Sequence, residues 1–162
     1  MNKKLFIAYF LVIAITIASL VFAVGAVKHY NSKNPKFSPP PFEKNAVSGK
    51  PDAKNIKSYS EMQAADAYIF GLCGEVTAKD GYADVYFTSI EGNNAWLKIR
   101  ILDENENIIA ESGLIKPGQY IKSVKLNTEI NSAINVTLKV MGYEPETYFS
   151  AGAVTLKTTL NV

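Results

Sequence analysis

An uncharged, strongly apolar run extends from Leu5 to Val27, with Lys4 before it and Lys28 after it. As an α-helix rising about 1.5 Å per residue, the run would be roughly 35 Å long. That length is enough to cross a hydrocarbon core about 30 Å thick. The run therefore predicts a transmembrane helix within residues 1–27, which would act as an uncleaved signal anchor for the rest of the chain.

A cleaved signal peptide is the alternative interpretation of the same run. Its small residues at 21–23 and 24–26 would suit cleavage, although a typical h-region is only about 7–15 residues long. Lysines soon after the run favour a cytoplasmic C-terminal part by the positive-inside rule. A short lysine-bearing N-terminal tail is nevertheless the usual start of an exported bacterial chain. We expect a single-pass membrane protein with an extracytoplasmic C-terminal domain, or a secreted domain if cleavage occurs.

The rest of the chain divides into two zones by composition. Residues 28–60 are rich in proline and lysine and poor in apolar residues, so we expect a semi-extended linker there. Residues 61–162 have the length of one small domain. Acidic residues outnumber basic ones in that domain, which argues against nucleic-acid binding.

Residues 61–162 have the pattern of β-strands. Apolar and polar residues alternate over 96–101, 134–141 and 154–162, which is typical of strands with one face in a core. Further strands are expected over 67–78, 82–90, 108–115 and 120–126. A capping pattern at 60–63 predicts one short helix before them. The spacing predicts an all-β domain, an antiparallel β-sandwich of about seven strands.

Leu114, the Pro117-Gly118 turn that follows it and the alternating strands on either side carry a resemblance. With these features, residues from about 67 to the end resemble the immunoglobulin-like or fibronectin-like β-sandwiches of bacterial membrane-anchored surface proteins. The resemblance implies an Ig-like antiparallel fold and no particular activity. The chain departs from antibody-type domains because Cys73 is its only cysteine, so no inter-sheet disulfide can form.

The expected domain offers little for catalysis. His29, the only histidine, precedes it, so no histidine-based triad can form within the domain. Cys73 has no histidine to activate it, and we expect it to be buried. Asp103–Asn107 begins like an EF-hand loop, but Ile108 and Leu114 stand where glycine and glutamate are needed. We expect a polar turn there, with calcium binding as the alternative, and we expect no enzyme activity, cofactor or metal.

One candidate binding site lies on the strand over 96–101. Trp96, Lys98 and Arg100 fall on the side opposite the predicted core. Aromatic and arginine side chains are typical anchors of interfaces, and a sugar ring could also stack on Trp96. The alternative is that a loop over 143–149 folds onto Trp96 and covers it.

That loop is the second candidate site. It carries three aromatic residues, Tyr143, Tyr148 and Phe149, and loops at the end of a β-domain often carry function. The alternative is that these rings only close the end of the fold.

These observations predict a non-enzymatic, membrane-tethered module at the bacterial cell surface. Its partner would be an envelope protein or a cell-wall glycan, and not nucleic acid. The alternative is a structural subunit of an envelope assembly, such as a pilus-like, conjugative or secretion apparatus. An apolar helix followed by a β-domain is similar to type IV pilins, although the glycine-ended leader and the glutamate near the start of the helix are missing.

Overall fold

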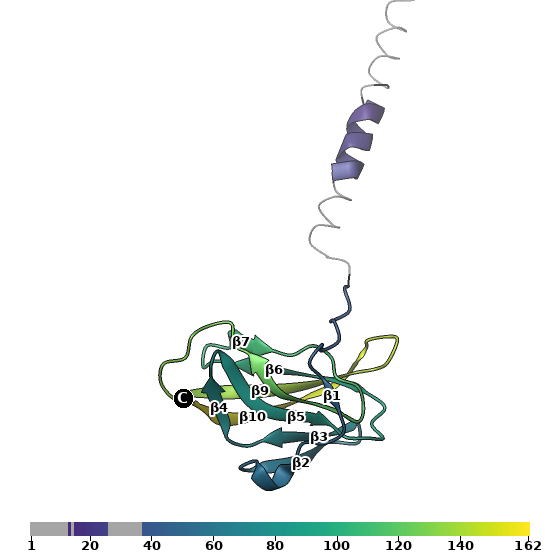
Figure 1. The fold of residues 1–162 in the computed structure, drawn as a ribbon. Helices are drawn as coiled ribbons and strands as arrows, with labels where there is room; N and C mark the ends of the chain where they lie inside the picture. The colour runs from purple at the N-terminus through teal and green to yellow at the C-terminus, as the bar shows by residue number, and fades with distance from the viewer. Residues whose placement is uncertain (1–12, 14, 26–36) are drawn as a thin grey trace, which may run out of the picture. The chain divides into compact units, whose positions relative to one another are not determined.

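The computed structural model describes residues 13, 15–25 and 37–162. The chain divides into two compact units, with the boundary between Ser38 and Pro39. The first unit contains a helix over residues 15–25 (Figure 1). The second unit, from Pro39 to Val162, contains the described strands, and it includes residues 39–60 of the expected linker.

The first unit corrects the prediction of a transmembrane helix. In the described part of the chain, no helix is both long enough and apolar enough to cross a membrane. A helix over residues 15–25 is roughly 16 Å long, about half of a hydrocarbon core. The remaining positions of the predicted anchor, residues 1–12, 14, 26 and 27, lie outside the described residues.

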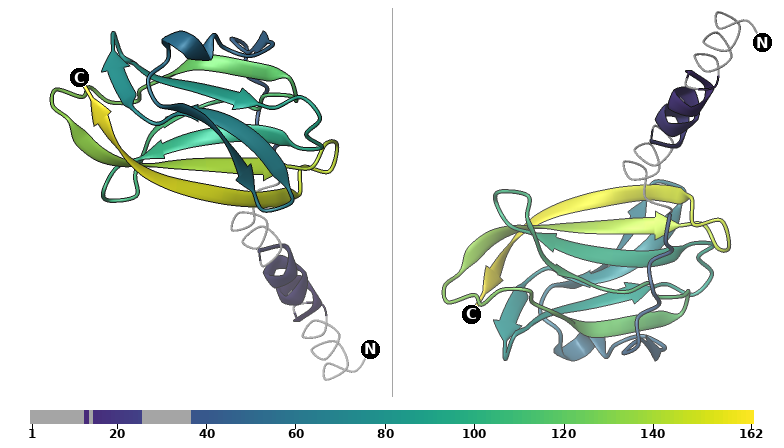
Figure 2. Two further views of the ribbon diagram at one scale, coloured as in Figure 1. Left: turned by 90° about the horizontal axis from the view of Figure 1, so that it is seen from below. Right: turned by 90° about the horizontal axis from the view of Figure 1, so that it is seen from above.

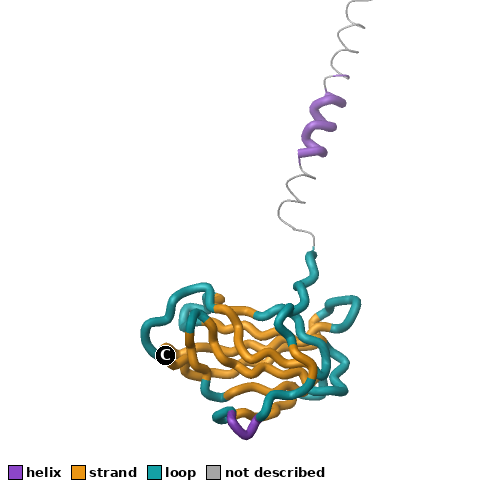
Figure 3. The backbone as a smooth tube through the Cα atoms, viewed as in Figure 1, coloured by secondary structure: helices purple, strands orange, loops and turns teal. Residues whose placement is uncertain are grey.

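The second unit consists mainly of strands joined by short loops, as Figure 3 shows. One turn of 3₁₀ helix, η1 (Ala53–Asn55), lies between the first two strands. The strands are β1 (Val47–Ser48), β2 (Tyr59–Ala64), β3 (Tyr68–Cys73), β4 (Val76–Lys79), β5 (Tyr82–Ser89), β6 (Trp96–Leu102), β7 (Ile108–Glu111), β8 (Gln119–Lys125), β9 (Ile134–Tyr143) and β10 (Ser150–Asn161).

These strands form one sheet that curls around a core. The main path of the sheet has the order β1-β8-β5-β4-β10-β9-β6-β7, while β3 pairs with β5 and carries β2 on its other side. An isolated bridge between Ala110 and Leu126 brings the β7 end back toward the end of β8. The curl places β8 and β5 on one side of the core, and β10, β9 and β6 on the other (Figure 2).

This topology corrects the predicted antiparallel, immunoglobulin-like sandwich of about seven strands. The sheet has ten strands and is mixed, because β10 runs parallel to β4 with Leu160 opposite Val76. The strand expected over 67–78 is divided into β3 and β4, and the two parts have different outer neighbours, β2 and β10. Alternation shows which side chains face a core, but it does not identify the neighbouring strand.

The short helix expected at residues 60–63 is also wrong. These residues lie within β2, which pairs with β3 from Tyr59 opposite Cys73 to Ala64 opposite Tyr68. The hydrogen bonds and packing that this pairing provides outweigh a local capping preference.

The alternating strands β6 and β9 bury their inward apolar residues largely as predicted, whereas Val162, at the end of the predicted strand 154–162, is 65% exposed. Leu97, Ile99 and Ile101 of β6 have no exposed surface, and alternate residues of β9 are also buried. On the other side of the core lie further fully buried side chains, which are Phe70, Val85, Phe87 and Ile121. Because these inner positions are filled, the intervening residues of β6, β9 and β10 face outward.

Candidate functional site

Trp96, the first residue of β6, lies between two other aromatic rings. The centroid of the Phe42 ring is 4.8 Å from that of Trp96, with an interplanar angle of 73°. The Tyr148 ring lies at 5.3 Å and 61° on the same indole. Both contacts are edge-to-face, which is an arrangement that the quadrupoles of aromatic rings favour. We call Phe42, Trp96 and Tyr148 the aromatic cluster, which joins three distant segments of the chain.

Phe42 is positioned by residues 39–43, which we call the docked segment. The Glu43 N–H donates to the Leu114 carbonyl at 2.8 Å, and the Leu114 N–H donates to the Pro41 carbonyl at 2.8 Å. The Gly113 N–H donates to Glu43 Oε2 at 2.8 Å. A Cβ atom at Gly113 would lie 2.5 Å from the Glu43 nitrogen. Glycine at this position therefore permits the close approach of the two backbones.

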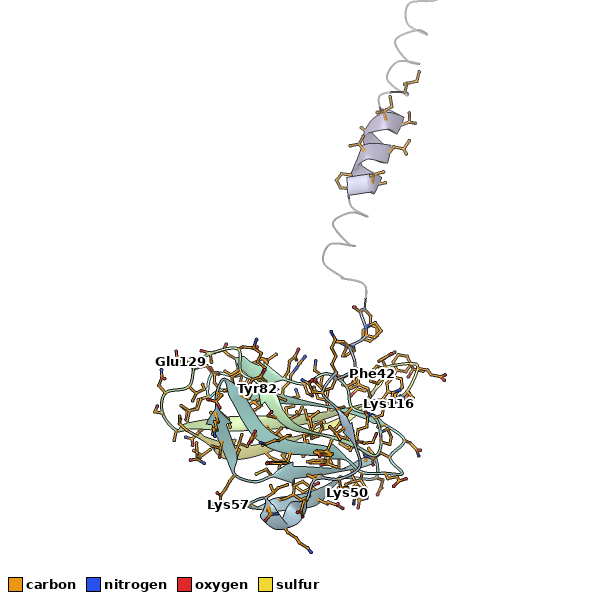
Figure 4. All side chains as sticks on the ribbon, viewed as in Figure 1. Phe42, Lys50, Lys57, Tyr82, Lys116 and Glu129 are labelled. Carbon is orange, nitrogen blue, oxygen red and sulfur yellow. The ribbon has the colours of Figure 1, made fainter. Side chains whose placement is uncertain are left out.

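Lys116 extends the aromatic cluster with a positive charge. Its Nζ lies 5.0 Å from the centroid of the Phe42 ring, within the range of a cation–π interaction. Figure 4 shows the two labelled side chains at the same end of the unit. Phe42 remains 39% exposed, so part of its ring is available to a partner.

The connection between β9 and β10 holds Tyr148 against Trp96. The Tyr148 N–H donates to the Glu144 carbonyl at 3.0 Å, and the Glu144 N–H donates to the Phe149 carbonyl at 2.8 Å. Tyr148 has φ 58°, in the left-handed region that bulky residues seldom adopt. Such a conformation costs on the order of 1–3 kcal/mol. The hydrogen bonds of the loop and the contact with Trp96 offset this strain.

Lys98 and Arg100 both bind Glu111 of β7. Lys98 Nζ lies 3.0 Å from Glu111 Oε2, and Arg100 Nε lies 2.8 Å from the same oxygen. Lys98 is only 5% exposed. Burial acts to raise the pKa of Glu111, but hydrogen bonds from Arg100 and Lys98 outweigh it and hold the pKa below its ordinary value. One carboxylate oxygen thus forms ion pairs with two cations.

The outward side chains of β7, β6, β9 and β10 form a continuous surface, which we call the outer face. Arg100 of β6 lies directly opposite Lys139 of β9. Glu111 lies beside Arg100 on β7, and Thr155 lies beside Lys139 on β10. Lys157 follows Thr155 in the next row of β10. Two cations, Arg100 and Lys139, therefore lie side by side at the centre of the outer face, and Lys157 lies in the next row.

The two ends of the outer face differ in chemistry. At one end Trp96 lies opposite Tyr143, beside the rest of the aromatic cluster. At the other end is a cleft of about 590 Å³, whose lining includes the acidic residues Asp103, Glu104 and Glu106 together with Asn135, Thr137 and Lys157. Asn135 Nδ2 donates to Glu104 Oε1 at 2.8 Å across this cleft.

The structure brings together only some of the residues predicted for binding. Trp96 and Tyr148 are in contact, as the alternative interpretation of the loop over 143–149 expected. Tyr143 is beside Trp96 in the sheet register, whereas Phe149 is 70% exposed at the loop. Lys98 is buried against Glu111, so it does not share an open surface with Trp96.

Sequence reasoning missed four residues of this region. Lys139 could have been found, because the alternation over 134–141 places it on the same side as the polar residues. Glu111, Phe42 and Lys116 carry no comparable pattern. Their roles depend on pairings between segments that are distant in the sequence.

Other candidate chemistry in the described residues is limited. Burial raises the pKa of the Cys73 thiol, which donates to the Glu75 carbonyl at 2.8 Å, so this thiol is a poor nucleophile. The Asp103 carboxylate accepts the N–H groups of Asn105 and Asn107 at 2.9 and 2.8 Å, as expected of a polar turn. Across residues 13, 15–25 and 37–162, no group of three His, Cys, Asp or Glu side chains is placed to hold a metal ion.

No protein-family model matches the chain, and no curated protein or solved structure matches it significantly. The geometry of the aromatic cluster and of the outer face therefore bears on the function of the second unit.

Proposed function

We propose that the second unit is a non-enzymatic interaction module that binds a protein or a glycan through the aromatic cluster and the adjoining outer face. One observation carries this proposal: Phe42, Trp96 and Tyr148 come from three distant segments and meet at the surface. The contact includes a tyrosine in a strained conformation. Strain of this kind gathers at ligand-binding sites.

The chemistry of the cluster suits recognition. Aromatic side chains are enriched among the residues that dominate binding energy. Phe42 remains partly exposed, and Phe149 beside Tyr148 is largely exposed. A partner that covers these rings would remove apolar surface from water, which stabilises the complex by roughly 25 cal/mol per Å² of apolar area before the costs of association.

Two features support a binding role rather than a catalytic one. The Cys73 thiol has a raised pKa, opposite to the shift that a nucleophilic thiol needs. The Glu111 carboxylate has a lowered pKa, opposite to the shift that a general acid at neutral pH needs.

The test uses the purified full-length chain in detergent. Trp96 is the only tryptophan, so its fluorescence reports directly on ligands at the cluster. We expect envelope glycans or a purified envelope protein to change this emission, and we expect Trp96→Ala to abolish binding measured by calorimetry. Tyr82→Ala is the matched control, because Tyr82 is an exposed aromatic residue on β5. Equal binding by both variants would overturn the proposed site.

The location of the module at the bacterial cell surface remains a prediction from the N-terminal sequence. Protease treatment of intact cells that carry a tag after Val162 tests it. Loss of the tag from intact cells supports an extracytoplasmic domain. Protection of the tag until lysis places the domain in the cytoplasm.

A further inference from the structure

We propose that the outer face binds an anionic glycan, whose carboxylate or phosphate groups lie against Arg100, Lys139 and Lys157. The inference rests on the proposed function and specifies the chemistry of its partner. It is carried by the distribution of charge across β6, β9 and β10.

The cations gather on one face of an acidic unit. Residues 39–162 contain all 15 acidic residues of the chain but only 12 of its 17 basic ones. Three of those basic residues, Arg100, Lys139 and Lys157, nevertheless have outward positions on the outer face, while Lys98 is only 5% exposed. Glu111 is in register with Arg100, and the acidic residues near Lys157 are those that line the cleft at the end of the face.

Two of the three outward cations form no ion pair within the part of the chain that the structure describes. Glu111 binds Lys98 and Arg100. Neither Lys139 nor Lys157 forms an ion pair with any residue that the structure describes. Arg100 and Lys139 are direct cross-strand partners, and like charges in that position destabilise a sheet. An anion bound between β9 and β10 would relieve this repulsion.

The surroundings favour a glycan over an acidic peptide. Next to the lysines lie side chains that hydrogen-bond to hydroxyl groups, which are Thr137, Thr155, Thr159 and Asn135. At the other end the aromatic cluster offers rings on which a sugar can stack. Both β6 and β9 already pair on their two sides, so they have no free edge for a peptide strand to join.

The dimensions of the face suit a chain of sugars. β6 runs for seven residues from Trp96 to Leu102, which spans roughly 20 Å at about 3.3 Å per residue. An extended anionic polymer can therefore contact the aromatic cluster and the lysines at the same time.

The experiment measures binding of the full-length chain to four named polymers. Polygalacturonate carries carboxylates, phosphomannan carries phosphates, dextran is neutral and poly-glutamate is an acidic peptide. We expect one or both of the anionic glycans to bind, with an affinity that falls as ionic strength rises. The double variant K139Q/K157Q should lose at least tenfold in affinity. Lys125→Gln, an exposed lysine on β8, is the matched control and should bind as the parent does.

Each outcome decides the inference. Binding to only one of the two anionic glycans supports it and identifies the anionic group. It is overturned if neither anionic glycan binds, if dextran binds equally well, or if K139Q/K157Q binds like the parent. It is also overturned if only poly-glutamate binds, in which case the partner is an acidic peptide.

The two variants distinguish a failure of the proposed function from a failure of this inference. If Trp96→Ala abolishes binding and K139Q/K157Q does not, binding through the aromatic cluster is supported and the anionic glycan is overturned. If K139Q/K157Q abolishes binding and Trp96→Ala does not, binding through the charged side chains is supported and the role of the aromatic cluster is overturned. A merely structural role of Lys139 is excluded if Lys139→Gln weakens binding while its thermal unfolding midpoint rises.

Discussion

Arg100 and Lys139 face each other directly across β6 and β9. Like charges in this position reduce the stability of a sheet, by an amount comparable to the roughly 0.2–1 kcal/mol of a favourable cross-strand pair. We therefore expect Lys139→Gln to raise the free energy of unfolding by up to about 1 kcal/mol. Urea denaturation of the full-length chain at low salt measures this change.

Two controls show whether the added stability of Lys139→Gln comes from the relief of charge repulsion. Lys125 lies opposite Tyr82 rather than a cation, so Lys125→Gln should leave the unfolding midpoint unchanged. High salt screens exposed charges, so the advantage of Lys139→Gln should shrink there. A destabilised Lys139→Gln variant would contradict the repulsion.

A second prediction concerns Glu111, whose Oε2 binds both Lys98 and Arg100. Removing the carboxylate leaves Lys98, which is almost fully buried, without a counter-charge. Hydrogen bonds to charged groups contribute about 1.5–3 kcal/mol each, but Glu111 is partly exposed, so we expect Glu111→Gln to lose about 1–3 kcal/mol in total. The double variant E111Q/K98M should recover much of this loss, because it also removes the buried charge. If the double variant recovers none of the lost stability, the unpaired charge of Lys98 is not the cause of the loss.

The pKa of Glu111 also predicts a dependence of stability on pH. Its pKa lies below the ordinary value of 4.5 in the folded state, so the unfolded state binds its proton more readily. The resulting stabilisation is fully present above the unfolded-state pKa, and it is lost as the pH falls through the folded-state pKa. Unfolding midpoints measured between pH 3 and pH 7 should therefore fall more steeply below about 4.5 for the parent than for Glu111→Gln. Parallel curves would contradict this assignment.

The sequence was sufficient to predict which side of β6 is buried. Leu97, Ile99 and Ile101 alternate with longer polar or aromatic side chains, and the structure buries all three. The same alternation did not predict the burial of Lys98. Its burial depends on neighbouring segments, and Glu111 comes from a strand whose pairing the pattern does not specify.

The candidate site was only partly predictable for the same reason. Trp96 and the loop that carries Tyr148 were identified from residue type and from the length of the connection. Phe42 was missed because it follows a run of prolines and has no periodic neighbours. Its position depends on the backbone hydrogen bonds between the docked segment and Leu114, which no local pattern predicts.

A further prediction uses Trp96 as a reporter of the aromatic cluster. Phe42→Ala and Tyr148→Ala each remove one ring from the indole, so the emission of Trp96 should move to longer wavelength in both variants. Each should also lose at least the roughly 0.5–1.5 kcal/mol that an aromatic contact adds. Phe149→Ala is the control, because Phe149 is 70% exposed and should change neither property. Unshifted emission in all three variants would mean that the rings do not contact Trp96 in solution.

The last prediction tests how the docked segment is held. In Gly113→Ala, the new methyl group would lie 2.5 Å from the Glu43 nitrogen and 2.7 Å from its Cα. These are backbone atoms, so the segment must move away, and we expect a loss of about 1–3 kcal/mol, typical of overpacking. Trypsin should then cleave faster after Lys44, while cleavage after Lys57, beyond η1, keeps its parental rate. If only cleavage after Lys44 is faster, the docked segment has moved and has taken Phe42 away from Trp96. The emission of Trp96 should then shift to longer wavelength, as in Phe42→Ala. Equal acceleration at both lysines would instead indicate that the whole unit unfolds, and the docked segment would then be inseparable from the fold.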